Sequence, residues 1–319
     1  MPADTLQAET TKPDERAEDR KPQPDGHVSD ANAAEADSDE EKENLIAPDL
    51  TEREKEDAAQ RTSVKATVVH EAVRLDGDAE LERSFSGLAS SGLAAGLSMG
   101  FSFIAEGLLR RYLPDSPWRP LLAKFGYSFG FLIVILGRQQ LFTENTLTAV
   151  IPVLARRTWK SLGKMIRLWT IVFLANMVGA HIVAWVLGNT SAFKPEVQNA
   201  FFQIAQETMN VSAPDALLRG IFAGWLIAML VWMMAAISSG QIPLIIIMTY
   251  FVALGSFTHI IAGSIEALFL VMTGHVSWMT FATSYMLPTL AGNCIGGVSL
   301  VAVVNHAQAV AGEQKKKPA

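Results

Sequence analysis

The sequence has little cysteine and, over most of its length, little charge. Cys294 is its one cysteine, so an intrachain disulfide framework is excluded. Residues 84–319 carry only 8 acidic and 15 basic side chains. Soluble domains contain about 25 % charged residues, so this part of the chain is too apolar to be an ordinary globular enzyme in water.

The N-terminal segment lacks the apolar side chains that a folded domain needs. Residues 1–60 contain no Phe, Trp or Tyr, and residues 1–83 carry 24 acidic against 11 basic side chains. Such a segment buries too little apolar surface to offset the entropy lost on ordering. Without an apolar run it is also not a signal peptide. We expect residues 1–61 to be a disordered acidic tail, either simply solvated or acting as a regulatory arm.

A short amphipathic helix is predicted between this tail and the apolar part. Val64, Val68, Ala72 and Leu75 recur at helical spacing, with charged residues between them. The pattern predicts a surface helix over residues 62–83.

Long uncharged runs predict that residues 84–312 form a transmembrane transporter domain within a lipid bilayer. A helix needs about 20 apolar residues to cross a bilayer. Pro, Gly and polar residues divide the runs into five candidate spans, near residues 85–108, 168–188, 216–238, 244–271 and 284–309.

One further crossing is predicted to be broken. The apolar runs 125–137 and 145–155 are each too short to cross alone, and the polar segment 138–144 separates them. Irregular backbone at membrane depth is tolerated where it is buried in protein or lines a cavity. Two half-helices joined by such a loop would make one span, so we expect six spans with the second broken.

Basic side chains indicate which loops face the cytoplasm. They crowd the connection 156–167 and the C-terminal tail 313–319, whereas the connection 189–215 is mostly acidic and 274–283 is uncharged. The positive-inside rule therefore places both termini in the cytoplasm. The basic residues of the loop 110–124 disagree with this orientation.

Two short motifs recur in the same order in both halves of the domain. Leu141-Phe142-Thr143 recurs in altered form as Ser256-Phe257-Thr258, and an Asn-x-x-Gly segment follows each, at Asn176–Gly179 and at Asn293–Gly296. Three spans in each half would make the second half inverted relative to the first. Inverted repeats with broken helices are typical of transport proteins, so we expect the fifth span to break near Gly255–Thr258.

These motifs together resemble the formate/nitrite transporter family over roughly residues 65–312. The long acidic tail is similar to that of an inner-membrane branch of the family in bacteria. The resemblance implies an all-α, aquaporin-like protomer of six transmembrane helices within a homopentamer, each protomer with its own pore. It also implies transport of small monovalent anions such as formate, nitrite or hydrosulfide.

The resemblance places the central pore histidine at His259, with Thr143 as its partner on the other half. A charged imidazole is costly in the middle of a span, so we expect His259 to be neutral. Proton transfer assisted by a histidine would let a weak-acid anion pass as the neutral acid. The alternative is a histidine that merely bonds a helix carbonyl.

The resemblance also predicts the apolar parts of the pore. Leu141 and Phe142 match the loop that closes the cytoplasmic side of the family's pore. Tyr127 and Phe131 match its constriction, with Phe251 or Val252 facing them. Apolar rings oppose the passage of hydrated ions.

Some positions depart from the family pattern. The resemblance expects two Asn residues and a vestibule Lys where this chain has Gly224, Gly263 and Thr208. Charges within a membrane are usually functional or paired. Arg138 and Glu144 could therefore bind an anion or pair with each other.

Two other acidic residues lie within predicted spans. Glu266 follows His259 by seven residues and could feed protons or pair with a neighbour. Glu106 and Arg110 lie one helical turn apart, which predicts an ion pair.

Other functions have weaker signals. His181, His275 and His306 lack metal-ligand spacing, no phosphate-binding Gly-rich loop is present, and the basic loop 156–167 is explained by topology rather than by nucleic acid. We expect neither a cofactor, nor a metal, nor an enzyme. Two alternatives to anion transport remain: a pore for small neutral solutes, and a non-transporting scaffold or sensor that acts through the acidic tail.

Overall fold

A computed structural model describes residues 50–55 and 64–308, and the chain divides into two units, residues 1–63 and 64–319. In the first unit, Thr51 and Glu54 hydrogen-bond to each other. The predicted tail 1–61 lies almost entirely outside the described residues, and the basic tail 313–319 lies wholly outside them.

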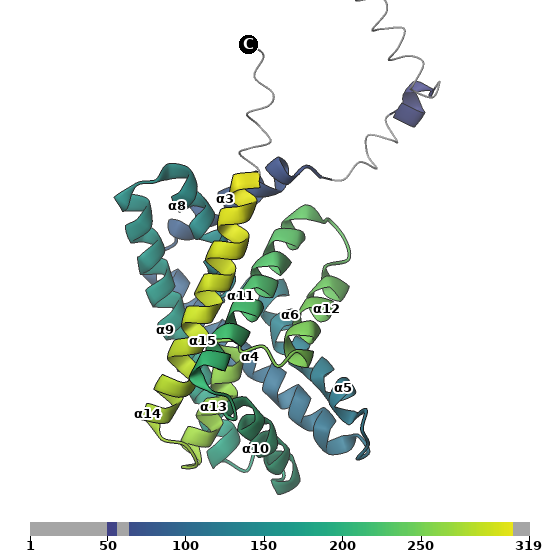
Figure 1. Cartoon of the computed structure of the whole chain (residues 1–319), viewed down its shortest axis with the longest axis vertical. Coiled ribbons are helices and arrows are strands. Elements are labelled where there is room, and N and C mark those ends of the chain that lie inside the picture. Colours follow the sequence, from purple (N-terminus) through teal and green to yellow (C-terminus); the bar gives the residue numbers. More distant parts are fainter. Residues whose placement is uncertain (1–49, 56–63, 309–319) are drawn as a thin grey trace, which may run out of the picture. The chain divides into compact units, whose positions relative to one another are not determined.

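The described part of the second unit is helical and contains no strand (Figure 1). Its first half comprises α3 (Ala66–Leu81), α4 (Phe85–Tyr112), α5 (Arg119–Ala123), η1 (Lys124–Tyr127), α6 (Ser128–Leu136), α7 (Asn145–Thr148), α8 (Val150–Arg156) and α9 (Trp159–Asn189). Its second half comprises α10 (Pro195–Met209), α11 (Ala213–Ala236), α12 (Gln241–Leu254), α13 (Ala262–Met272), α14 (Trp278–Thr280), η2 (Phe281–Met286), α15 (Leu287–Cys294) and η3 (Ile295–Val303).

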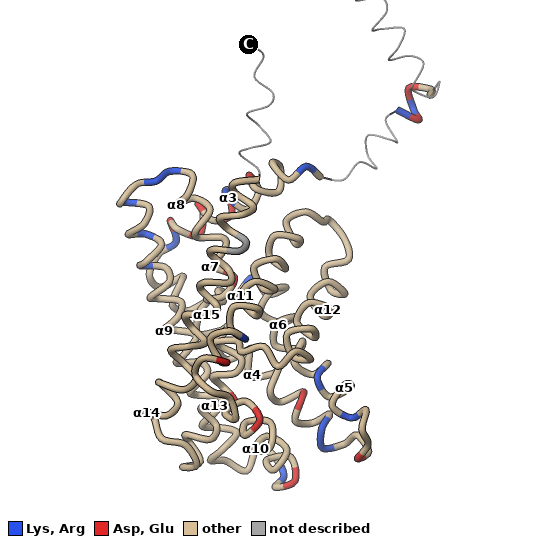
Figure 2. Tube along the Cα trace, in the orientation of Figure 1, with Lys and Arg blue, Asp and Glu red and all other residues tan. Residues whose placement is uncertain are grey.

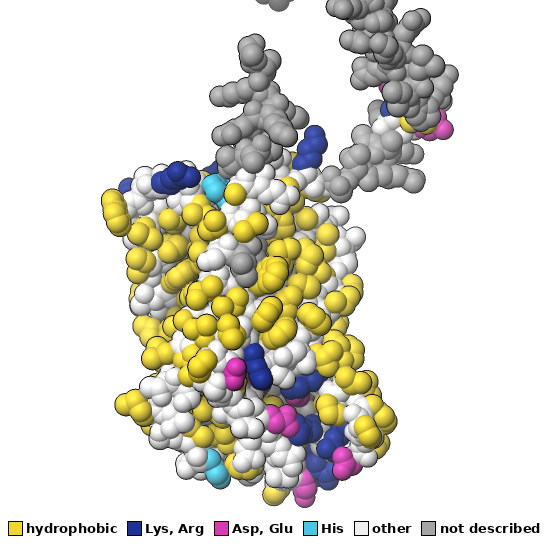
Figure 3. Space-filling model, in the orientation of Figure 1, with side chains coloured by type: hydrophobic (Ala, Val, Ile, Leu, Met, Phe, Trp, Pro, Cys, Tyr) yellow, Lys and Arg dark blue, Asp and Glu magenta, His cyan; other side chains and the backbone are white. Residues whose placement is uncertain are grey.

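Five continuous helical stretches of the described residues are long and apolar enough to cross a membrane: Phe85–Tyr112, Arg119–Leu136, Trp159–Asn189, Ala213–Ala236 and Trp278–Gln308. The second joins α5, η1 and α6, and the last contains α14, η2, α15 and η3. Hydroxyl N-caps set where three of the five stretches begin, because the side chains of Ser84, Thr158 and Ser212 each accept a hydrogen bond from a backbone N–H of the first turn. On the face seen in Figure 3, apolar side chains cover the middle of the helical unit and charged side chains gather at its two ends.

The ends of the helical unit differ in charge. Lys and Arg residues crowd the corner between α8 and α9, whereas both signs of charge mix around α5 and α10 (Figure 2). At the corner, α3 is attached by ion pairs: Asp78 binds Arg156 at 2.7 Å, and Glu82 binds Lys164. The hydrogen bond from Lys164 lowers the pKa of Glu82, because it stabilises the carboxylate.

Two interruptions divide the apolar segments, one between α6 and α7 and one between α12 and α13. Each contains a non-glycine residue in the left-handed region, Arg138 with φ 51° and Ser256 with φ 50°. The predicted span 244–271 consists of two helices, α12 and α13, as expected of a broken span. The break predicted at Gly255–Thr258 falls within the second interruption.

Glycines let the helices of each half approach closely. α4 packs on α9, and a Cβ at Gly96 would overlap the backbone of Asn176; α11 packs on α15, and a Cβ at Gly224 would overlap the backbone of Asn293. Gly224 thus faces a neighbouring helix, which leaves no room for the Asn side chain that the family resemblance expects there.

Candidate functional site

The two interruptions meet at one buried polar contact. His259 Nε2 lies 2.8 Å from Thr143 Oγ1, and the two side chains are 1 % and 0 % exposed. Thr143 belongs to the first interruption and His259 to the second. The contact therefore joins the two halves of the described domain.

The surroundings of His259 determine where its ring carries hydrogen. The backbone N–H groups of Ile261 and Ala262 point at Nδ1, at 3.3 and 3.2 Å. Since an N–H can only donate, Nδ1 must accept, and the ring hydrogen sits on Nε2. His259 then donates to Thr143 Oγ1, and the threonine hydroxyl keeps its own hydrogen to donate elsewhere.

Apolar side chains enclose this pair. The Phe131 ring lies edge-on to His259, with ring centroids 5.1 Å apart, and Tyr127 follows Phe131 at 5.3 Å. Leu141 and Phe142 are buried in the same core. An ion arriving at His259 without its water would find few polar partners, so the surroundings favour an uncharged species.

Phe251 and Val252, the two alternatives for the residue that faces the constriction, differ in burial. The Phe251 side chain is 53 % exposed, whereas the neighbouring Val252 is completely buried. Consecutive residues of a helix point about 100° apart, so only one of the two can face Phe131.

Two asparagines hold the interruptions by the same set of contacts. Asn176 accepts from the N–H of Phe142 and donates to the carbonyls of Gln140 and Gly92. Asn293 accepts from the N–H of Ile260 and donates to the carbonyls of Thr258 and Gly220.

The glycines of the same motifs lie at helix contacts. A Cβ at Gly179 would crowd the backbone of α4, and one at Gly296 would overlap the backbone of α11. Gly179 and Gly296 therefore allow the close helix approach that positions the two asparagines.

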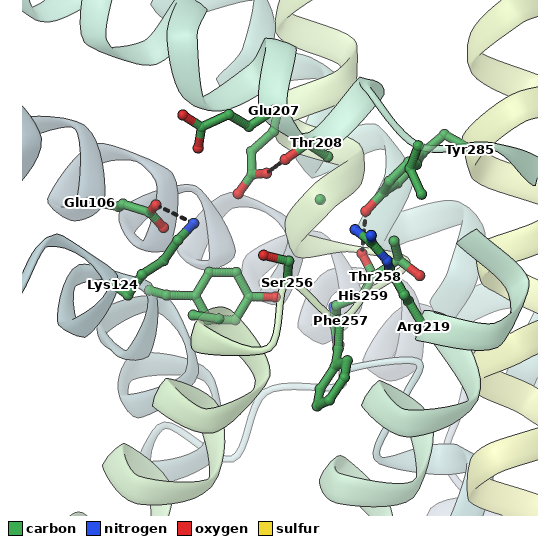
Figure 4. A pocket seen from close by; sticks show the side chains of 15 residues that line it. Glu106, Lys124, Glu207, Thr208, Arg219, Ser256, Phe257, Thr258, His259 and Tyr285 are labelled. Carbon is green, nitrogen blue, oxygen red and sulfur yellow. Dashed lines mark hydrogen bonds and ion pairs between the residues drawn. The ribbon is translucent and has the colours of Figure 1, made fainter. Parts of the chain in front are cut away.

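A cavity of about 70 Å³ opens beside His259; we call it the acid vestibule (Figure 4). It has room for a few water molecules. Its polar lining consists of Glu106, Lys124, Tyr127, Glu207, Thr208, Arg219, Ser256, Thr258, His259, Glu266 and Tyr285.

Ion pairs in the acid vestibule differ from those predicted. Lys124 Nζ lies 2.6 Å from Glu106 Oε1, and Arg110 lies 2.5 Å from Glu207. The predicted pair between Glu106 and Arg110 is therefore wrong. Glu106 pairs with a residue of η1 and Arg110 pairs with a residue of α10, so residue spacing along α4 could not predict either ion pair.

Tyr285 occupies the place where the resemblance expects an asparagine. A Cβ at Gly263 would overlap the Tyr285 hydroxyl, and this hydroxyl donates to the carbonyl of His259 at 3.4 Å. Tyr285 lies in the π-helical segment η2, a distortion often found at functional sites. The sequence patterns did not indicate Tyr285 or Lys124 as residues of the site. For Lys124, its position directly before the apolar run 125–137 could have indicated a cation near a span.

A second cavity, of about 310 Å³, lies on the α3 side of the first interruption, and its lining includes Asp76, Glu80, Arg138 and Glu144. The expected ion pair between Arg138 and Glu144 is absent from the ion pairs of the described residues. Arg138 is exposed, and Glu144 Oε1 is enclosed without a hydrogen-bond partner. Among residues 50–55 and 64–308, no cluster of three or more His, Cys, Asp or Glu side chains could hold a metal ion.

Comparison with known proteins identifies similar chains. Residues 67–307 match the model of the family described as "Formate/nitrite transporter". The "Inner membrane protein YfdC" of Escherichia coli (strain K12) is 45 % identical over 248 residues, which cover 78 % of this chain and 80 % of that protein. The "Formate channel FocA" of Haemophilus influenzae is 26 % identical, covering 67 % of this chain and 83 % of that protein.

A solved structure shares the fold. A "Pentameric formate channel with formate bound" superposes with a TM-score of 0.61 at 20 % identity, covering 71 % of this chain and 98 % of that one.

Proposed function

Because this chain belongs to the formate/nitrite transporter family, a family of transporters and channels, we propose that it carries small monovalent anions of weak acids, of the formate, nitrite or hydrosulfide type. The observation that carries the proposal is the His259–Thr143 hydrogen bond, enclosed by apolar side chains and open to the acid vestibule.

The geometry supports passage as the neutral acid. A bare anion entering the apolar surroundings of Phe131 loses its water without gaining a counter-charge, whereas the protonated acid does not carry that cost. His259 Nε2 and the Thr143 hydroxyl then offer hydrogen bonds to the acid between the two interruptions. His259 assists the transfer of the proton there.

The proposed architecture is a homopentamer of aquaporin-like protomers in a bacterial inner membrane. Each protomer crosses six times as two inverted three-helix halves, with α6–α8 as the broken second span and α12–α13 as the broken fifth. Both chain termini lie in the cytoplasm. The like contacts of Asn176 and Asn293 support the two related halves.

Uptake into liposomes tests the function. Purified protein should take up formate, nitrite or hydrosulfide faster at the lower of two pH values. His259→Ala should reduce this uptake by about 10²-fold and change its pH dependence. His275→Ala, the same substitution at an exposed loop position, is the control and should retain both. Wild-type protein that moves none of these anions would refute the proposal.

A pore for small neutral solutes is the second candidate. The observation that favours it is the acid vestibule, where the carboxyl groups of Glu106, Glu207 and Glu266 outnumber the two cations of the lining, Lys124 and Arg219. Uptake of glycerol or water in the same liposomes, without any anion uptake, would support this second function.

A further inference from the structure

Two buried carboxyl groups line the acid vestibule, and one of them pairs with a lysine. Glu106 and Glu266 are 1 % and 5 % exposed, and Lys124 Nζ lies against Glu106 at 2.6 Å. Glu266 makes no ion pair with any residue that the structure describes. Among the described residues, its hydrogen-bond partner is the Thr208 hydroxyl, which donates to Oε2.

The remaining charged groups around Glu266 do not supply a second cation. Arg110 of α4 is engaged by Glu207 of α10, and Arg219 of α11 lines the cavity without an ion pair to Glu266. The titratable groups of the neighbouring elements are Glu106 on α4, Lys124 and Tyr127 on η1, Glu207 on α10, Arg219 on α11, Tyr285 on η2 and His259 before α13. Burying a carboxylate without a paired cation is costly, and protonation removes that cost.

We propose that Glu266 carries a proton and donates it to the anion that enters the acid vestibule, an inference that rests on the proposed transport of weak acids. The Thr208 hydroxyl occupies Oε2, so the proton resides on Oε1, the oxygen left open to the cavity. The O–H bond of Glu266 breaks, a new O–H bond forms on formate or nitrite (an S–H bond on hydrosulfide), and the neutral acid moves on to His259.

The return step uses water and keeps the charge balanced. Glu266 is left as a carboxylate close to the Glu106–Lys124 pair and takes a proton from water in the vestibule, and the hydroxide that remains leaves to the bulk water outside. The proton thus crosses with the anion. Glu106 cannot play this part, because its carboxylate already holds Lys124.

Thr208 is what keeps Glu266 free of a cation. A hydroxyl stabilises either protonation state, whereas a lysine at the same position would pair with the carboxylate and hold it ionised. Thr208→Lys therefore provides a variant that removes the proton without removing Glu266.

Transport by the full-length protein in liposomes tests the role of Glu266. Glu266→Gln keeps the size and the hydrogen bond to Thr208 but has no proton to give. We expect formate uptake to fall by about 10²-fold and to become nearly independent of external pH. Glu196→Gln makes the same change at an exposed residue of α10 and should retain both the rate and the pH dependence. Glu266→Gln with wild-type rate and pH dependence would overturn the proposal.

Infrared spectroscopy gives a second readout that needs no transport. Wild-type protein should show the carbonyl stretch of protonated carboxyl groups at neutral pH, and this band should lose the intensity of one carboxyl group in Glu266→Gln and in Thr208→Lys. An undiminished band in either variant, or its absence from wild-type protein, would overturn the proposal. Wild-type protein without any anion uptake would instead refute the transport function, and the infrared band would still report on Glu266.

Discussion

At the residue scale, Gly263 and Tyr285 explain how the site differs from the family pattern. Gly263 stands four residues after His259, where the family pattern has an asparagine. The Tyr285 hydroxyl, from a different helix, fills the space that this asparagine side chain would occupy. The polar group beside His259 is therefore retained while its source changes. A phenol presents one donor and one acceptor at a rigid position, which suits a narrow site.

Replacement of Gly263 tests this arrangement. Gly263→Ala should destabilise the protein by about 1–3 kcal/mol, because its methyl group would overlap the Tyr285 hydroxyl. Thermal unfolding followed by size exclusion measures the loss. The control is the same substitution at Gly163, where a Cβ meets open space, and it should be tolerated. A Gly263→Ala protein as stable as wild type would contradict the predicted overlap.

At the element scale, the two interruptions are related by a shift of 118 residues. Before the interruptions, the backbone N–H of Gly137 donates to the carbonyl of Ile133, and that of Gly255 donates to Phe251. After them, the N–H of Asn145 donates to the carbonyl of Leu141, and that of Gly263 donates to His259. Sequence matching paired Phe142 with Phe257, which is wrong by three residues. Phe142 corresponds to Ile260, and Leu141 corresponds to His259. The two Phe-Thr motifs contain similar residues at positions that do not correspond. What the two interruptions share is a backbone conformation, with Arg138 and Ser256 in the left-handed region.

Loss of either asparagine should open its interruption. Asn176→Ala and Asn293→Ala each remove three buried hydrogen bonds. We expect each to lower stability by about 2–4 kcal/mol, and by similar amounts, because the two side chains bind the same set of backbone groups. Unfolding of the purified variants in a denaturant series would measure this. Asn189→Ala, at an exposed helix end, is the control, and a pair of variants with unequal effects would argue against equivalent roles.

At the scale of the whole molecule, the exposed surface of one protomer points to further burial. Large apolar side chains lie exposed along α4, α9 and α11, for example Phe101, Leu174 and Phe222. A bilayer covers such surfaces, and so do neighbouring protomers. The fold is shared with a pentameric formate channel, which supports the proposal that five copies assemble.

Mass measurement tests the assembly. The purified full-length protein in mild detergent should have a protein mass of five times the 34.6 kDa chain, measured by native mass spectrometry or by light scattering with correction for detergent. Dilution should leave the mass unchanged if the interfaces are large and apolar. A monomer or dimer at all concentrations would refute the pentamer.

The long apolar helices follow from the sequence alone. Hydrophobic runs longer than about 20 residues are a local property that can be read along the chain. The family motifs also pointed to His259 and Thr143. The charged loops, however, gave conflicting signals about orientation.

Which side chains meet depends on how the helices pack. Glu106 pairs with Lys124 and not with Arg110, and the Tyr285 hydroxyl fills the space beside Gly263. Each partner comes from a different helix, and its position depends on how close two backbones approach. Helix packing sets that distance, and no spacing along one helix encodes it. The few charges in an otherwise uncharged domain are therefore where the fold, rather than the sequence, assigns the chemistry.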